Sequence, residues 1–329
     1  MKPLPSVRSP SSAILGIFDG AHDAGACVVA GGRILAAVNE ERLTRVKLQN
    51  GMPLRSVAEV LHLSGVRARD IEAVAFGSTL TPQIYLRALR FAQKRLKLEE
   101  GYFFTAHPTL LQRLTDYVQF ASSITAMRSD SFLARAEVAA LNLLLRKDLP
   151  AAVRWKPIRI VDHHLAHAAA AHFTSGQRAT LCITADGVGD GHSMTVCECR
   201  GRDIQRLWQI GPHQSFAWFY ALITIYLGFM PYRHEGKVVG LAGHGDPAKV
   251  RVPFPFAVNG ADVRYAWRFG LAAREFLAQL DGHSREDVAA WLQAGTERCV
   301  TAVVRHWLQK TGLCDVTLAG GLFANVKLN

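Results

Sequence analysis

Residues 157–193 read PIRIVDHHLAHAAAAHFTSGQRATLCITADGVGDGHS and contain two strand patterns separated by a helix pattern. The β-branched run from Ile158 to Val161 is typical of a buried strand. The histidines that follow lead into a run of alanines. Because alanine is the strongest helix former, we expect these histidines in the first turns of a helix. Residues 180–184 form the second strand pattern, and the order strand, helix, strand predicts an α/β fold.

The helix pattern places two histidines on one face. His163 and His167 are four residues apart, so their Cβ atoms should lie about 5–6 Å apart. Imidazoles in this arrangement can bind one divalent metal ion, although helical histidines also serve as core or capping residues. His164 stands where the HExxH helix of a metalloprotease has its glutamate, which argues against that class. The third ligand stays open among Asp23, Asp186, Asp190 and a residue beyond Asn329.

The second strand pattern ends in a segment that could hold a phosphate. Residues 186–190 read DGVGD, and we expect a loop there. Gly187 and Gly189 would let the backbone approach a ligand and direct N–H groups at phosphate oxygens. A purely structural turn is the alternative.

The same spacing occurs earlier in the chain. Residues 19–23 read DGAHD and match residues 186–190 in the pattern Asp-Gly-x-x-Asp, at an offset of 167 residues (186 minus 19). Each copy follows an apolar strand pattern and precedes two more. Repetition of a three-strand unit indicates a duplicated fold. We therefore expect the two segments to face each other across one cleft and to grip one phosphorylated ligand.

The duplication predicts the domain organisation. We expect residues 1–176 to form a first half, with a helical insertion at about 82–149, and residues 177–329 to form a second half. In the first half, residues 158–174 supply a final strand and helix. No counterpart follows Gly320 and Gly321, so the second half is expected to be incomplete.

Composition limits the class of protein. The chain has 329 residues, a net charge of +11 and six cysteines without a CxxC pair, which indicates reduced thiols in the cytoplasm. Its N-terminus lacks the apolar run of a signal peptide. The uncharged residues 215–232 are interrupted by glycine and proline, which favours a buried core helix over a membrane span. The basic run at 87–97 has helical spacing, typical of a solvated face, so we expect neither membrane nor nucleic-acid partners.

Six motifs together resemble a known family. In chain order they are ILGIFDGAHDAGACVV, NEERLTRVK, VDHHLAHAAAAHF, TADGVGDGHS, YLGFMPYRHEGKVVGLAGHGDP and LAGGLFANVKLN. They resemble the O-carbamoyltransferases of nodulation-factor and antibiotic biosynthesis. The resemblance implies a duplicated actin-like, sugar-kinase-like (ribonuclease H-like) fold. That family is similar to the universal tRNA threonylcarbamoyl-transfer protein and to the carbamoyltransferase of hydrogenase maturation.

The resemblance also implies an activity. In such proteins a C-terminal domain makes carbamoyl-adenylate from carbamoyl phosphate and ATP, and the actin-like domain transfers the carbamoyl group to a hydroxyl of a small-molecule acceptor. It assigns His163 and His167 to an iron-type divalent metal. It places His22 and Asp23 near the transferred group, with Lys47 as a ligand to that group. The residues that it assigns to the adenylate are Asp186, Gly187, Gly189, Asp190, Gly320, Gly321 and Asn325.

The family takes its third metal ligand from an aspartate beyond the end of this sequence. The resemblance places the adenylate-forming domain outside this sequence as well, so we expect no transfer from carbamoyl phosphate and ATP by this chain alone. The expected chemistry is acyl-type transfer, with His22 as base, oriented by Asp23. Alternatives are a kinase or ATPase with Mg²⁺ between Asp19 and Asp186, a tRNA threonylcarbamoyl-transfer relative, and a non-catalytic fragment that binds nucleotide or a partner. A homodimer is among the expected assemblies.

Overall fold

The computed structural model describes residues 12–20, 22–77, 139, 142–266 and 271–329. The described residues up to His163 form one compact unit, and those from His164 form a second. The expected helical insertion lies largely outside the described residues. We expected the first half to reach residue 176, whereas the helix that starts at His163 packs with the second unit.

The first unit is built on a mixed five-stranded sheet with the order β3-β2-β1-β4-β5. β1 pairs antiparallel with β2 and parallel with β4, and β4 pairs parallel with β5. Its strands are β1 (Ala13–Phe18), β2 (Gly25–Ala30), β3 (Arg33–Asn39), β4 (Ile71–Phe76) and β5 (Ile158–Ile160).

Helix α2 (Leu54–Ser64) packs against this sheet, and the short α1 (Glu40–Thr44) and η1 (Ala68–Asp70) flank it. The N-cap residue of α2 is Pro53, which has no side-chain hydrogen-bond acceptor to cap the helix. The buried carboxylate of Glu40 takes that role and accepts from the Ser56 amide at 2.7 Å and the Arg55 amide at 3.1 Å. Part of the NEERLTRVK motif is therefore structural.

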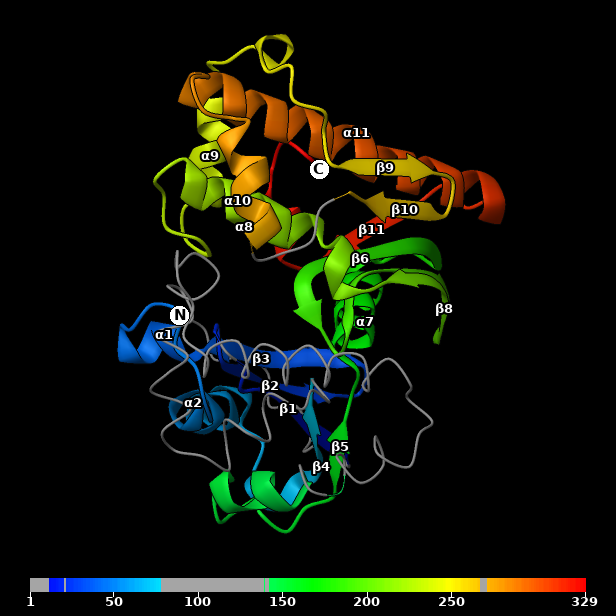
Figure 1. Cartoon of the computed structure of the whole chain (residues 1–329). Helices are drawn as coiled ribbons and strands as arrows, with labels where there is room; N and C mark the ends of the chain where they lie inside the picture. Colours follow the sequence, from blue (N-terminus) through cyan, green and yellow to red (C-terminus); the bar gives the residue numbers. More distant parts are fainter. Residues whose placement is uncertain (1–11, 21, 78–138, 140–141, 267–270) are drawn as a thin grey trace, which may run out of the picture. The chain divides into compact units, whose positions relative to one another are not determined.

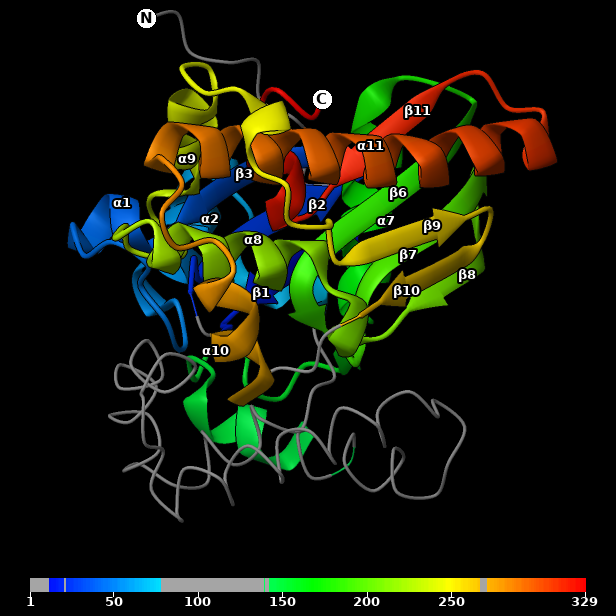
Figure 2. The ribbon, with the colours of Figure 1, turned by 45° about the horizontal axis from the view of Figure 1, so that its top comes forward.

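The second unit contains a four-stranded sheet with the order β11-β6-β7-β8. Helix α7 (His163–Ser175) packs on one face through Ala168 and a cysteine cluster, and α8 (Phe216–Tyr226) and α11 (Arg285–Thr311) pack on the other (Figures 1 and 2). The strands are β6 (Ala179–Gly189), β7 (His192–Arg200), β8 (Asp203–Ile210) and β11 (Val316–Ala319).

Strands β9 (Phe256–Asn259) and β10 (Asp262–Tyr265) form a hairpin beside α11, as Figure 2 shows. Its Phe256 and Tyr265 rings lie against Phe219 of α8, which is fully buried. Residues 215–232 thus contain the expected buried helix, and no described helix is long and apolar enough to cross a membrane. The remaining elements are η2 (Pro212–Gln214), α9 (Glu235–Ala242), η3 (Pro247–Lys249), α10 (Leu271–Ala278) and η4 (Gly321–Ala324).

The two sheets confirm the predicted duplication. In each sheet an antiparallel three-strand meander is joined by a parallel strand that pairs with its first strand. Asp23 and Asp190, which end the two matched motifs, both have left-handed backbone conformations, with φ of 56° and 49°. Few non-glycine residues adopt this conformation, and aspartate is among those that tolerate it. The α/β class and the repeat are therefore confirmed.

The structure corrects one local expectation. Residues 186–189 do not form a loop, because β6 continues to Gly189, which pairs with His192. The register shifts between Ala185 and Gly189, so this end of β6 is a bulged strand. The turn itself is confined to Asp190 and Gly191. Glycine within a strand often marks such a bulge, and the pattern alone does not distinguish it from a loop.

Candidate metal centre

Helix α7 and strand β6 bring three potential metal ligands together. One ligand atom each from His163, His167 and Asp186 lies within 4.8 Å of the others. All three side chains are half-buried, so an ion could reach them from solvent. The expected histidine pair is therefore on one helix face, and Asp186 is the one of the three candidate aspartates that joins it. Two imidazoles and a carboxylate form a ligand set typical of catalytic transition-metal sites.

Hydrogen bonds fix the carboxylate of Asp186. Its Oδ2 lies 2.9 Å from His167 Nε2, and its Oδ1 accepts from the Gly321 amide at 2.9 Å. Its backbone carbonyl accepts from the Ser215 hydroxyl at 3.1 Å. Ser215 also caps the N-terminus of α8, where it accepts from the Trp218 amide. The carboxylate is therefore held by β6, α7 and the Gly320–Gly321 segment together.

The glycines around Asp186 allow close packing. A Cβ atom on Gly187 would lie 2.5 Å from Trp218 Nε1, and one on Gly321 would lie 2.8 Å from Asp186 Oδ1. Gly320 has a φ of 97°, and a Cβ there would overlap the backbone of Ala185. The sequence predicted that these glycines open the backbone to phosphate. In this structure protein atoms occupy the space beside them, and their binding of adenylate stays a prediction.

The other residues that the resemblance assigns to the adenylate, Asn325, Gly189 and Asp190, are buried. The buried side chain of Asn325 donates to Gln293 Oε1 at 2.8 Å, and its Oδ1 accepts from the Lys327 and Leu328 amides. Gln293 also accepts from the Tyr220 hydroxyl, so Asn325 helps to tie η4 to α11 and α8. Gly189 and Asp190 are buried at the turn into β7. Adenylate binding by these residues also stays a prediction.

The expected transfer residues lie in the first unit. His22 Nδ1 and Asp23 Oδ2 are 2.9 Å apart, and Lys47 Nζ is 2.9 Å from Glu41 Oε1. The hydrogen bond from His22 lowers the pKa of Asp23, partial burial opposes it, and the charges of His22 and Lys47 add to the lowering. An ionised Asp23 can hold His22 in one tautomer. That the two Asp-Gly-x-x-Asp segments share a cleft stays a prediction.

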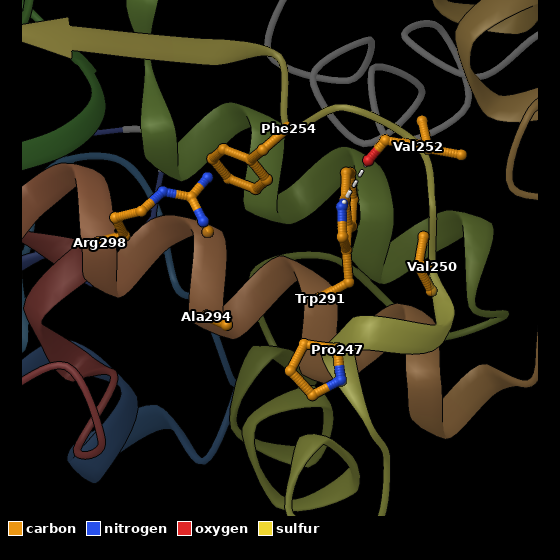
Figure 3. Close-up of a pocket in the computed structure, with 8 residues that line it drawn as sticks. Pro247, Val250, Val252, Phe254, Trp291, Ala294 and Arg298 are labelled. Atoms are coloured by element: carbon orange, nitrogen blue, oxygen red, sulfur yellow. Dashed lines mark hydrogen bonds between the residues drawn. The ribbon is translucent and has the colours of Figure 1, made fainter.

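A separate pocket of about 240 Å³ lies between α11 and residues 247–254 (Figure 3). Apolar side chains line it, including Phe254 and Trp291, with Arg298 at one end. The Trp291 indole donates to the Val252 carbonyl at 2.9 Å, which fixes one wall. None of the expected site residues lines this pocket, so it is distinct from the candidate metal centre.

Two residues that hold Asp186 and its neighbour Gly187 in place, Ser215 and Trp218, were not predicted from the sequence. Ser215 precedes a strongly apolar run, and a serine in that place is a recognisable helix N-cap signal. Trp218, which lies against Gly187, carries no such signal, because its role depends on which strand and helix meet in space. The HHLAH spacing does not indicate that His164 is buried.

Comparisons with known proteins identify the family of this chain. The family model described as Carbamoyltransferase N-terminus matches residues 13–329. The chain belongs to the carbamoyltransferase family. Nodulation protein NolNO of Sinorhizobium fredii is 31% identical over 317 residues, which cover 94% of this chain and 42% of that protein.

Two further similarities are more distant. The protein sll1178 of Synechocystis is 27% identical over 339 residues, covering 96% of this chain and 51% of its own length. Among solved structures, HypF of T. kodakarensis is similar at 14% identity with a TM-score of 0.45, covering 96% of this chain and 43% of that one. This carbamoyltransferase-family chain thus spans about half the length, or less, of these two curated relatives.

Proposed function

We propose that this chain carries the transfer site of a metal-assisted carbamoyltransferase. In the proposed reaction a carbamoyl group moves from carbamoyl-adenylate, itself made from carbamoyl phosphate and ATP, to a hydroxyl of a small-molecule acceptor. The observation that carries the proposal is the convergence of His163, His167 and Asp186 within 4.8 Å in a chain that belongs to this family.

The three residues fit a divalent transition ion. Two ligands of one ion, each about 2.0–2.2 Å from it, lie about 3 Å from each other. The 2.9 Å separation of His167 Nε2 and Asp186 Oδ2 meets that requirement, and ion binding would replace the proton that the pair now shares. Mg²⁺ prefers oxygen ligands and retained waters, so the histidine pair favours an iron-type ion over the Mg²⁺ of a kinase.

The chain's own residues have separate roles in this proposal. A bound ion would polarise the carbamoyl-adenylate as a Lewis acid. Gly321 holds Asp186 through its amide, which leaves the other carboxylate oxygen on the side of His167. The backbone around Gly187, Gly189 and Asp190, together with Gly320 and Asn325, would bind the adenylate.

The first unit would supply the proton transfer. When His22 Nδ1 donates to Asp23, Nε2 is the nitrogen that accepts a proton. The acceptor hydroxyl attacks the carbamoyl carbon, the bond from that carbon to the phosphate oxygen breaks, AMP leaves, and the hydroxyl proton passes to His22 Nε2. Lys47 would bind the transferred group through its charge.

The test supplies preformed carbamoyl-adenylate to the pure chain with Fe²⁺ or Co²⁺ and a panel of hydroxyl acceptors, and measures AMP release and carbamoylated product. We expect metal-dependent transfer that falls at least about tenfold in His163→Ala, His167→Ala and Asp186→Asn. Transfer that ignores all three substitutions would overturn the metal assignment. Formation of ADP and a phosphorylated acceptor from ATP would instead identify a kinase.

A further inference from the structure

The residue between the two candidate ligands is fully buried. His164 has no exposed surface, and its ring contacts both β6 and β7. Its Nε2 lies 2.9 Å from the His192 carbonyl oxygen, and its Nδ1 lies 2.6 Å from Thr184 Oγ1. A carbonyl oxygen can only accept, so Nε2 carries the hydrogen. In a neutral ring with the hydrogen on Nε2, Nδ1 accepts from the Thr184 hydroxyl.

This hydrogen-bond chain continues across the sheet. Thr184 and Thr195 are directly paired on β6 and β7, both are fully buried, and their hydroxyl oxygens are 2.7 Å apart. With the only proton of Thr184 directed at that ring nitrogen, the hydrogen bond between the two threonines takes its proton from Thr195. Rotation of α7 would leave buried hydroxyl groups without their hydrogen-bond partners, which is unfavourable, so the chain of hydrogen bonds resists that rotation.

The position of His164 on the helix determines where its neighbours point. Successive helical residues are rotated by about 100°, so His163 lies about 100° to one side of His164 and His167 about 60° to the same side. With His164 directed into the sheet, both candidate ligands face one side of α7, about 40° apart. Thr184 is two residues before Asp186 on β6, so one strand anchors the helix and supplies the third ligand.

A second histidine of α7, away from the candidate ligands, makes the same kinds of hydrogen bond as His164. His172 is also buried, its Nδ1 lies 2.9 Å from Thr180 Oγ1, and its Nε2 lies 3.1 Å from the Gly201 carbonyl oxygen. Both histidines thus bond a β6 threonine and a backbone carbonyl. The His172 arrangement provides a control with the same chemistry but without a neighbouring ligand set.

We propose that His164 is a positioning residue for the metal centre. Its hydrogen bonds to Thr184 and His192 set the rotation of α7 so that His163 and His167 reach Asp186. This inference rests on the proposed metal function. It adds a role for a histidine that would bind neither the ion nor the substrate.

The experiment titrates Co²⁺ into the full chain and follows the visible absorption of the ion, which reports its ligand number and geometry. Thr184→Val removes the hydroxyl at nearly constant shape, and Thr180→Val does the same at the control arrangement. We expect Thr184→Val to weaken Co²⁺ binding by about tenfold or more and to alter the spectrum. Thr180→Val should lower the melting temperature to a similar extent but leave Co²⁺ affinity within about twofold.

Two further variants keep the test decisive if Thr184→Val folds poorly. Thr184→Ser retains the hydroxyl and should restore the parent spectrum, and Thr195→Val should give an intermediate loss. Parent-like affinity and spectrum in folded Thr184→Val or Thr195→Val would overturn the positioning role while leaving the metal site intact. Co²⁺ binding by the parent that is absent, or insensitive to His163→Ala and His167→Ala, would overturn the metal site and the positioning role together.

Discussion

At the residue scale, the candidate centre depends on how closely backbone segments approach Asp186. Gly320 permits one approach, because its left-handed φ of 97° and missing side chain bring Gly321 within hydrogen-bond distance of the carboxylate. A glycine here is therefore required by the protein's own packing. That requirement would hold whether or not a nucleotide binds beside it.

Gly320→Ala should therefore be more damaging than an alanine at another left-handed glycine. Gly282 has a φ of 83° with nothing within 4 Å of an added Cβ, so Gly282→Ala should cost only the backbone strain of about 1–2 kcal/mol. Gly320→Ala adds an overlap with Ala185 and should cost about 1–3 kcal/mol more. It should also weaken Co²⁺ binding, since the Gly321 amide would shift. Urea unfolding and Co²⁺ titration measure both effects, and equal losses in the two variants would contradict this account.

Single residues also show what the sequence could and could not predict. The histidine pair was predictable because a helix places residues four apart on one face. The choice of Asp186 over Asp23 and Asp190 was not, because it depends on the contact between α7 and β6. The burial of His164 was equally hidden, since its partners lie 20 and 28 positions away.

At the element scale, the strands and the repeat followed from apolar patterns and the Asp-Gly-x-x-Asp spacing. The glycine-rich segment did not, because a bulged strand and a loop have the same composition. Helix α11 gives a second example of the limit. Its interior glycine, Gly295, would be expected to weaken a helix, yet the ring of Phe254 lies directly on it. Only the tertiary contact explains that residue.

Two alanine substitutions in helices should therefore have opposite signs. In α9, an added Cβ on Gly240 meets nothing within 4 Å, so Gly240→Ala should stabilise the protein by about 0.5–1 kcal/mol through helix propensity. In α11, Gly295→Ala would overlap the Phe254 ring and should destabilise by about 1–3 kcal/mol despite the same propensity gain. Denaturant unfolding gives both signs. Stabilisation by Gly295→Ala would show that Phe254 can move away at little cost.

At the scale of the whole molecule, each unit has its own hydrophobic core. Leu15 of β1 is fully buried in the core of the first unit, and Leu181 of β6 is fully buried in that of the second. No buried residue is shared between these two clusters. Separate cores are the physical condition for separate unfolding, and in that case a single free energy of unfolding would not describe the chain.

We accordingly expect calorimetry to resolve two transitions that respond to different substitutions. Leu15→Ala and Leu181→Ala remove the same side chain from equally buried sites, and each should cost about 2–5 kcal/mol. Co²⁺ identifies the second unit's transition, because two of its three proposed ligands, His167 and Asp186, belong to that unit and an ion that binds only the folded site stabilises it. Leu181→Ala should lower the Co²⁺-sensitive transition and Leu15→Ala the other. If both substitutions instead lower one common transition equally, the two cores unfold together, and cooperativity between the units would be strong enough to override their separate packing.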